Sequence, residues 1–234
     1  MKKIVVLLLV FSLLSLTSCG LSQKKEDTAF TVADICAIAN RAVPTTVITE
    51  MSLTTEKDTL NGFYTTATNG TDAVFTFNYE RFATPEESLE SGKSNRLVEV
   101  KGVVNYRDGV YYGVVTVDDE TYLDGVYTPE EDLLTPGTGT AFDLKFNVDE
   151  SLLADATVSE DGYSVTAKVS KENLVKLIGT DLNSTGDAGI IIETNGKNLT
   201  FVTVSCTTAN GKLVLRSSFT NTIQDLFPEP EESK

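Results

Sequence analysis

The segment from Arg96 to Val117, RLVEVKGVVNYRDGVYYGVVTV, decides the fold. Apolar residues recur at alternate positions up to Tyr106 and again from Val110, which is the two-residue period of a β-strand. The Asp108-Gly109 pair between the two runs favours a tight turn, because glycine accepts a positive φ. The sequence therefore predicts an antiparallel hairpin here, and a fold built largely from hairpins.

Segments of the same character lie on both sides of this hairpin, rich in Thr, Val, Phe and Tyr. Asn-Gly pairs, which favour hairpin turns, stand at 69–70, 195–196 and 210–211. We expect a polar loop over 85–95, and the best candidate for a soft division of the domain is the loop at 135–140. The predicted strands, besides the hairpin, are 45–56, 59–68, 73–82, 121–127, 142–148, 163–169, 189–194, 199–207 and 212–219.

Two helices are expected. Thr31 can cap the first, with Asp34 three residues later, and an apolar stripe then follows helical spacing until Pro44 ends the helix. Ser170 can cap the second, which Gly179 stops. A single helical turn is expected over 150–154.

Two of the predicted strands carry apolar residues on both faces. In one, Tyr112 and Val114 alternate with Tyr111 and Val115, and the strand at 199–207 shows the same pattern. An antiparallel strand with one face in water should alternate cleanly between apolar and polar. Something must therefore cover both faces, and a second sheet, packed helices and a bound apolar ligand remain alternatives.

The N-terminus has the pattern of an export signal. Two lysines follow Met1, and the run to Leu16 is apolar apart from two serines. As a helix this run would rise roughly 20 Å, too little for a hydrocarbon core of about 30 Å. We therefore expect residues 1–18 to be a cleaved signal peptide, 19–28 a flexible tether, 29–222 a single α+β domain and 223–234 an acidic tail.

The residues Leu16-Thr17-Ser18-Cys19 resemble the bacterial lipobox. The resemblance implies that Cys19 receives a diacylglycerol and becomes the first residue after cleavage, and two acyl chains anchor a protein stably. An ordinary signal peptide that contains a cysteine is the alternative. We expect a lipid-anchored protein of the cell membrane that faces the outside or the periplasm.

Charge and composition exclude several function classes. The formal net charge is −15, and losing Lys2 and Lys3 with the signal makes it −17. Such a chain repels nucleic acid, so we expect no nucleic-acid partner. It contains no histidine and no glycine-rich phosphate loop, and we read the acidic run around 118–124 as solvated turns. We therefore expect no enzyme activity, no metal and no cofactor.

Two further cysteines, Cys36 and Cys206, fall at positions expected to face the core. An exported protein can form disulfides, so one alternative is a bond between them. The other alternative is a pair of buried thiols, which pack as small apolar groups.

The order of elements, with a lipidated cysteine, a helix, a meander, more helices and more strands, resembles the LolA and LppX/LprG class of lipoprotein domains. That resemblance implies a strongly curved antiparallel sheet, a half-barrel, with short helices packed on one face and a lipid or lipidated ligand between them. We expect a non-enzymatic protein that binds an apolar or amphipathic ligand. A structural or adhesive lipoprotein, or an accessory subunit with an envelope protein partner and a filled core, is the alternative. The pocket-lining candidates, for which ordinary core is the alternative, are Phe75, Phe77, Tyr79, Tyr112, Val114 and Phe201.

Overall fold

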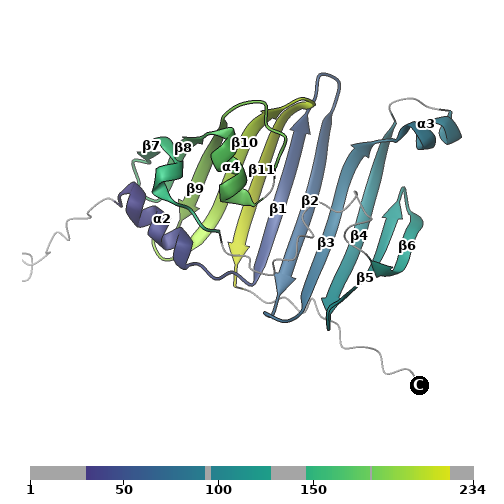
Figure 1. Cartoon of the computed structure of the whole chain (residues 1–234), viewed down its shortest axis with the longest axis horizontal. Helices are drawn as coiled ribbons and strands as arrows, with labels where there is room; N and C mark the ends of the chain where they lie inside the picture. Colours follow the sequence, from purple (N-terminus) through teal and green to yellow (C-terminus); the bar gives the residue numbers. More distant parts are fainter. Residues whose placement is uncertain (1–29, 93–95, 128–145, 180, 222–234) are drawn as a thin grey trace, which may run out of the picture.

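The computed structural model describes residues 30–92, 96–127, 146–179 and 181–221 (Figure 1). In these ranges the chain forms one open, eleven-stranded antiparallel sheet and three short α-helices. The expected antiparallel sheet with few helices is confirmed, whereas a strongly curved half-barrel is not. The strands are β1 (Thr46–Thr54), β2 (Thr59–Thr68), β3 (Ala73–Phe82), β4 (Leu97–Arg107), β5 (Val110–Val117), β6 (Glu120–Tyr127), β7 (Ala154–Val158), β8 (Ser164–Val169), β9 (Ala188–Thr194), β10 (Leu199–Thr208) and β11 (Gly211–Thr220).

The sheet consists of two meanders joined in the middle. Its order is β6-β5-β4-β3-β2-β1-β11-β10-β9-β8-β7, and every neighbouring pair is antiparallel. The junction is β1 with β11, which pair without a shift from Thr46 opposite Thr220 to Thr54 opposite Lys212. The first and last described strands therefore lie side by side, and β6 and β7 are the two edges.

The hairpin that decided the prediction is present. Asp108 and Gly109 both have positive φ, 54° and 83°, as the tight turn between β4 and β5 requires. Two strand predictions need correction. The short strand β7 was not expected, and residues 146–148, the described part of the strand predicted over 142–148, are not in a strand. The loop at 135–140 lies outside the described residues.

Helix α2 (Val32–Arg41) forms as predicted. Thr31 and Asp34 make a reciprocal capping box: the Thr31 side chain accepts from the Asp34 amide, and the Asp34 carboxylate accepts from the Thr31 amide. The hydrogen bond from the Thr31 side chain is the larger of the two causes that lower the pKa of Asp34. The buried side chains of the helix, Ile35, Cys36, Ile38 and Ala39, turn one stripe towards the protein.

The side chain of Asn40 at the end of α2 fixes the non-strand segment at 146–148. Its Nδ2 donates to the Val148 carbonyl oxygen at 2.8 Å, and its Oδ1 accepts from the Val148 amide at 2.7 Å. These two bonds replace the ladder bonds that a strand would have supplied. Phe146 and Val148 can therefore face the core without joining the sheet.

Two more helices and a 3-10 turn complete the secondary structure. The turn (Glu150–Leu152) and helix α4 (Lys171–Ile178) were expected, and α4 ends at Gly179 with φ 75°. Helix α3 (Pro85–Ser91) replaces the predicted polar loop. The sequence contains a signal for this helix, because Thr84 and Glu87 have the spacing of a capping box and Pro85 stands at the first helical position.

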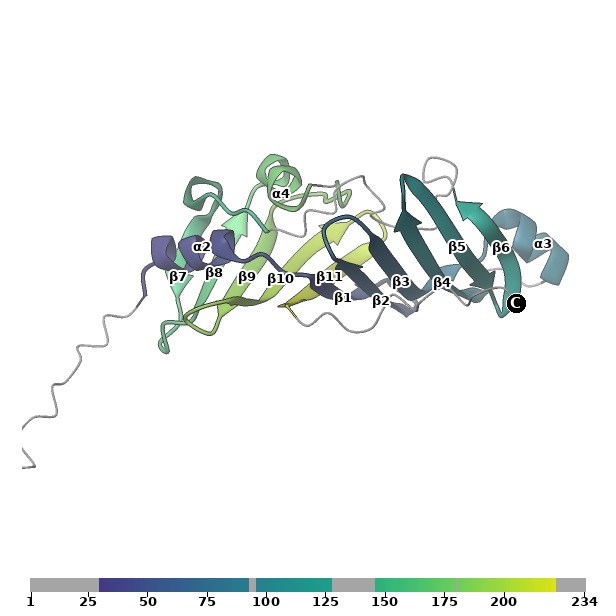
Figure 2. The same cartoon turned by 90° about the horizontal axis from the view of Figure 1, so that it is seen from below.

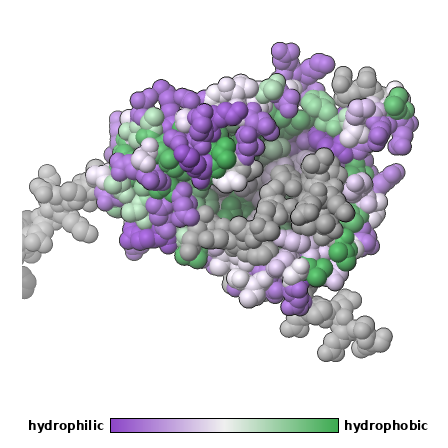
Figure 3. Space-filling model, viewed as in Figure 1, coloured by the Kyte–Doolittle hydropathy of each residue, from purple (hydrophilic) through white to green (hydrophobic). Residues whose placement is uncertain are grey.

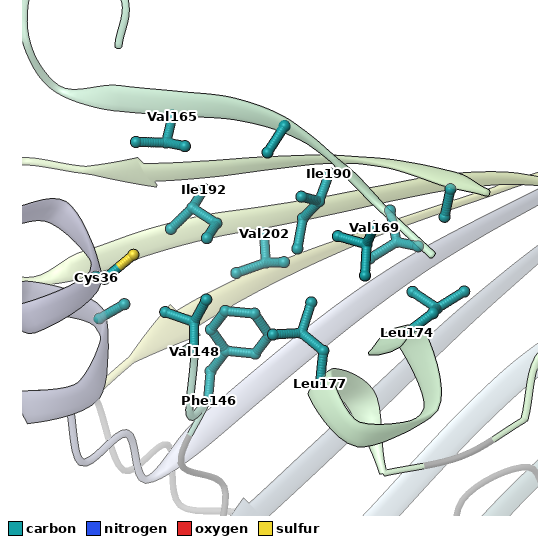
Figure 4. Close-up of a cluster of buried hydrophobic side chains, with 14 of the residues drawn as sticks. Cys36, Phe146, Val148, Val165, Val169, Leu174, Leu177, Ile190, Ile192 and Val202 are labelled. Carbon is teal, nitrogen blue, oxygen red and sulfur yellow. The ribbon is translucent and has the colours of Figure 1, made fainter. Parts of the chain in front are cut away.

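The two faces of the sheet differ. We call the face that α2 and α4 cover the inner face, and the opposite one the outer face. Both helices lie over the β7–β10 side of the sheet (Figures 1 and 2). Between them and the strands, Ile35 and Leu174 belong to one core cluster with inner-face residues of β8 to β11. Figure 4 shows Phe146 and Leu177 directed at the side chains of Ile190 and Val202. This half of the inner face is therefore closed and well filled.

Replacing Asn40 by alanine tests how the 146–148 segment is held. Asn40→Ala removes both hydrogen bonds to the backbone of Val148, whose side chain is buried. The substitution should therefore lower the free energy of unfolding by about 1–2 kcal/mol. Urea unfolding measures it. Asn105→Ala, at an exposed position of β4, is the matched control and should change stability much less. Equal effects of the two substitutions would contradict this role of Asn40.

Candidate functional site

A cavity of about 920 Å³ lies at one end of the sheet. It is bounded by the β1–β2 turn, the β10–β11 turn and the end of β3, and we call it the loop-end cavity. No described helix residue lines it. Its lining residues are Leu53, Thr54, Thr55, Glu56, Lys57, Leu60, Arg81, Phe82, Thr208, Ala209, Asn210 and Gly211.

The apolar part of the lining comes from paired strands. Leu53 of β1 lies directly opposite Leu60 of β2 and, on its other side, opposite Leu213 of β11. Leu53 also packs against the core cluster under the helices. The loop-end cavity therefore adjoins the main core and is continuous with the inner face. In the space-filling view the inner face is hollowed beside its helix-covered half (Figure 3).

A close contact between two turns shapes this end of the sheet. Gly211 has φ 145°, and a Cβ at this position would lie 2.1 Å from the carbonyl oxygen of Thr54. Only glycine tolerates this conformation and this approach. The β10–β11 turn consequently lies directly against the end of β1, where both border the cavity.

Arg81 is the charged residue on the inner face of β3 at the cavity. Its side chain is 18% exposed and makes an ion pair with Glu87 of α3, with Nη1 and Nη2 each 2.8 Å from a different carboxylate oxygen. Nη1 also donates to the carbonyl oxygen of Phe82 at 3.1 Å. Nε is buried and has no hydrogen-bond partner.

The ion pair keeps both groups charged. The hydrogen bond from Arg81 is the main cause that lowers the pKa of Glu87 to about 2, and the bond to Glu87 raises the pKa of Arg81. Glu87 accepts from the Thr84 amide as well, since Thr84 and Glu87 form the capping box of α3. Helix α3 therefore fixes the orientation of the guanidinium.

The β1–β2 turn places a second cation at the cavity. Lys57 is exposed, and its backbone amide donates to the Thr55 hydroxyl at 3.2 Å. Thr55 and Asp58 bridge the turn through a backbone bond of 2.8 Å. The cavity thus combines leucines at its base with Arg81, Lys57 and Glu56 in its wall.

Three of the six predicted pocket residues lie together on the inner face. Phe75, Phe77 and Tyr79 of β3 are all less than 10% exposed and form a cluster with Val100, Val104 and Val115. The rings of Phe77 and Tyr79 lie 6.1 Å apart. Phe77 covers Gly102 of β4, where a Cβ would come 2.1 Å from its ring. These three residues therefore form a second core and do not line the loop-end cavity.

The other three lie on the outer face. Tyr112 and Val114 pair with Asn105 and Val103 and are 51% and 46% exposed. Phe201 is half-buried beneath the Arg216 guanidinium, whose carbon is 4.2 Å from the ring centre. The six candidates are thus divided between the two faces and do not line one cavity. Phe77 and Val114 border a shallower outer-face groove of about 410 Å³, together with Phe63, Thr76, Asn78, Lys101, Gly102, Val103 and Thr116.

Sequence analysis missed the residues that do line the loop-end cavity. For Arg81 the sequence did contain a signal. It follows Phe75, Phe77 and Tyr79 at the same two-residue spacing, so a charged residue stands where the pattern predicts an apolar, inward-facing one. Leu53 gave no such signal, since its place at a cavity depends on the pairing of β1 with β11.

Cys36 and Cys206 are free thiols, both buried in the core under the helices. Burial is the main cause that raises the pKa of each thiol, and for Cys36 the carboxylates of Glu150 and Asp149 add to it. Of the two alternatives, the structure shows buried thiols. Cys19 lies outside the described residues.

The acidic residues of the turn at 118–119 form ion pairs within the sheet. Asp118 forms an ion pair with Arg96 and accepts a hydrogen bond from the Glu99 amide, and Asp119 pairs with Lys101. Across the described ranges, no group of three or more Cys, Asp or Glu side chains is arranged to hold a metal ion. None of the helices in those ranges has the length and apolarity needed to cross a membrane.

Comparisons with known proteins do not place the chain in a family. No protein-family model matches the sequence, and no curated protein matches it.

Acid should weaken the Arg81–Glu87 contact. The pKa of Glu87 is about 2 in the fold against an ordinary 4.5, so its stabilisation is complete above about pH 5 and is lost as the pH falls towards 2. Glu87→Gln should lower the free energy of unfolding at pH 7 by about 1–2 kcal/mol, since the pair is partly exposed. The difference from the unsubstituted protein should be mostly lost at pH 2.

Urea unfolding at several pH values measures this difference. Glu86→Gln is the control, because the neighbouring Glu86 is exposed and forms no ion pair with another described residue. A loss from Glu87→Gln that stays constant from pH 7 to pH 2 would contradict the assignment.

Thiol reactivity tests the state of the cysteines. In a Cys19→Ser variant, a thiol reagent such as DTNB should react with neither Cys36 nor Cys206 in the folded protein, since both are buried and protonated. After unfolding in guanidinium without a reductant, two thiols should titrate. If no thiol reacts after unfolding, Cys36 and Cys206 are joined in a disulfide.

Proposed function

We propose that this protein is a non-enzymatic, membrane-anchored envelope lipoprotein that binds an apolar or amphipathic ligand. The observation that carries the proposal is the loop-end cavity. Its volume of about 920 Å³ falls within the roughly 300–1,000 Å³ of small-molecule sites. Leu53, Leu60 and Phe82 offer apolar surface, and burying an acyl chain would contribute about 0.8 kcal/mol per methylene.

The anchor in this proposal rests on the N-terminal sequence. The lipobox-like residues 16–19 support acylation of Cys19, and the polar stretch that follows would hold the domain a short distance from the membrane. The strong negative charge supports attachment through lipid and not through a basic surface. A ligand with a long apolar chain suits a protein held next to a bilayer.

A second candidate function is an accessory or adhesive lipoprotein that acts through protein contacts. The outer face favours it, because it carries four apolar side chains that are 44–51% exposed. They lie on β2, β4 and β5, with β3 between β2 and β4, and are Phe63, Val103, Tyr112 and Val114. Exposed apolar patches of this kind often mark interaction sites. The experiment below separates the two functions.

Filling part of the loop-end cavity should weaken ligand binding. Leu53 is half-buried and lines the cavity, so Leu53→Trp should occupy part of its volume and weaken binding of a fluorescent fatty alcohol by roughly tenfold or more. Native mass spectrometry of the unsubstituted protein purified from its membrane should also find a co-purified lipid.

Val114→Trp, in the outer-face groove, is the matched control and should leave the affinity unchanged. Thermal unfolding of both variants verifies that each is folded. If neither a co-purified lipid nor binding of the probe is found, the proposed function fails. If only Val114→Trp weakens binding, the outer face is the site.

A further inference from the structure

Arg81, which lines the loop-end cavity, has hydrogen-bond donors that the described part of the chain does not satisfy. A guanidinium has five N–H donors in a fixed plane. Glu87 takes one from each terminal nitrogen of Arg81, and the Phe82 carbonyl takes the second donor of Nη1. Two donors remain, on Nε and Nη2.

The geometry of the group puts these two donors on one edge. Since Glu87 occupies the edge formed by the two terminal nitrogens, the Nε–H and the remaining Nη2–H lie parallel along the side of the guanidinium. That edge matches the two oxygens of a carboxylate or phosphate. Nε has no acceptor, which costs free energy, and it is buried from solvent, so an anion that takes both donors must displace the atoms that cover Nε.

The charges around the cavity permit an anion there. Its wall contains Arg81, Lys57 and Glu56, and Glu87, which adjoins through Arg81, has both oxygens already bonded to the guanidinium. Glu80 is on the outer face by register and accepts from the Asn61 amide. Asp118 also acts on Arg81 electrostatically, but it is paired with Arg96. Cations therefore balance carboxylates at this place, whereas the whole chain carries −15.

We infer that the ligand of the loop-end cavity is an anionic amphiphile. Its carboxylate or phosphate binds the free edge of Arg81, in a cavity that Lys57 also lines, while its chain contacts Leu53 and Leu60. The inference rests on the proposed function and adds the chemical class of the ligand. Helix α3 then orients Arg81 for the ligand, because Glu87 binds the terminal nitrogens of the guanidinium and leaves the edge formed by Nε and Nη2 unoccupied.

The test uses the purified lipoprotein in phosphatidylcholine nanodiscs at pH 7.5, with empty nanodiscs as the blank. Equilibrium dialysis compares decanoate and decyl phosphate with 1-decanol, which has the same chain without a charge, and with inorganic phosphate. Both anionic amphiphiles should bind at least about tenfold more tightly than 1-decanol. Inorganic phosphate should show no binding at millimolar concentration.

Two neighbouring substitutions should act in opposite directions. Lys57→Gln should weaken binding of decanoate about threefold and Glu56→Gln should strengthen it by a similar factor, because both side chains are exposed and screened by salt. Neither should change the affinity for 1-decanol. Both lie on an exposed turn, so the fold should tolerate them.

Arg81→Lys should remove the preference for the anion, and Lys57→Gln tests the inference if Arg81→Lys does not fold.

The other results separate the two claims. Equal affinity for decanoate and 1-decanol, unchanged by the substitutions, would overturn the anionic class and leave the proposed function standing. Inorganic phosphate binding as tightly as decyl phosphate would show a site for a free oxyanion and overturn the amphiphile. Binding of none of the four compounds would overturn both.

Discussion

The pairing of β1 with β11 is the interaction on which the rest of the structure depends. Nine consecutive residue pairs, from Thr46–Thr220 to Thr54–Lys212, join two meanders that are otherwise separate in the order of strands. Without this pairing each meander would have an unpaired edge in the middle of the molecule. The same pairing brings the β1–β2 and β10–β11 turns together, and Gly211 allows their backbones to touch. The cavity is thus a consequence of how the two meanders join at the centre of the sheet.

The two halves of the sheet carry separate cores on the inner face. Beneath α2 and α4 the inner face is a filled core, with Phe146 and Val148 held in place by Asn40. At the other half the aromatic side chains of β3 lie over small residues of β4 such as Gly102 and form a core of their own. At the strand ends, beside the helix-covered core, the packing leaves space. A ligand there would contact Leu53, which packs against that core, and would leave the second core untouched.

Much of the fold was predictable from local patterns, and the errors have physical causes. Alternation and Asp-Gly or Asn-Gly turns located most strands, and Pro44 and Gly179 bounded two helices. The loop predicted over 85–95 contains α3 because a capping box at Thr84 and Glu87 outweighs the lack of an apolar stripe. Phe146 and Val148 alternate like strand residues, but a side chain of α2 takes the place of a neighbouring strand. The face on which Tyr112 or Phe75 lies depends on register between strands, which no local pattern determines.

The candidate site was less predictable than the fold. Leu53, Arg81 and Gly211 are separated by up to 158 positions in the chain and meet only through the sheet order. The central claim is that an apolar ligand occupies the space where they meet. A crystal structure of the protein purified from its native cells, without added ligand, tests this most directly. The account predicts elongated electron density running from Leu53 and Leu60 towards the Arg81 guanidinium. A cavity that holds only ordered water, or that is closed by the two turns, would contradict it.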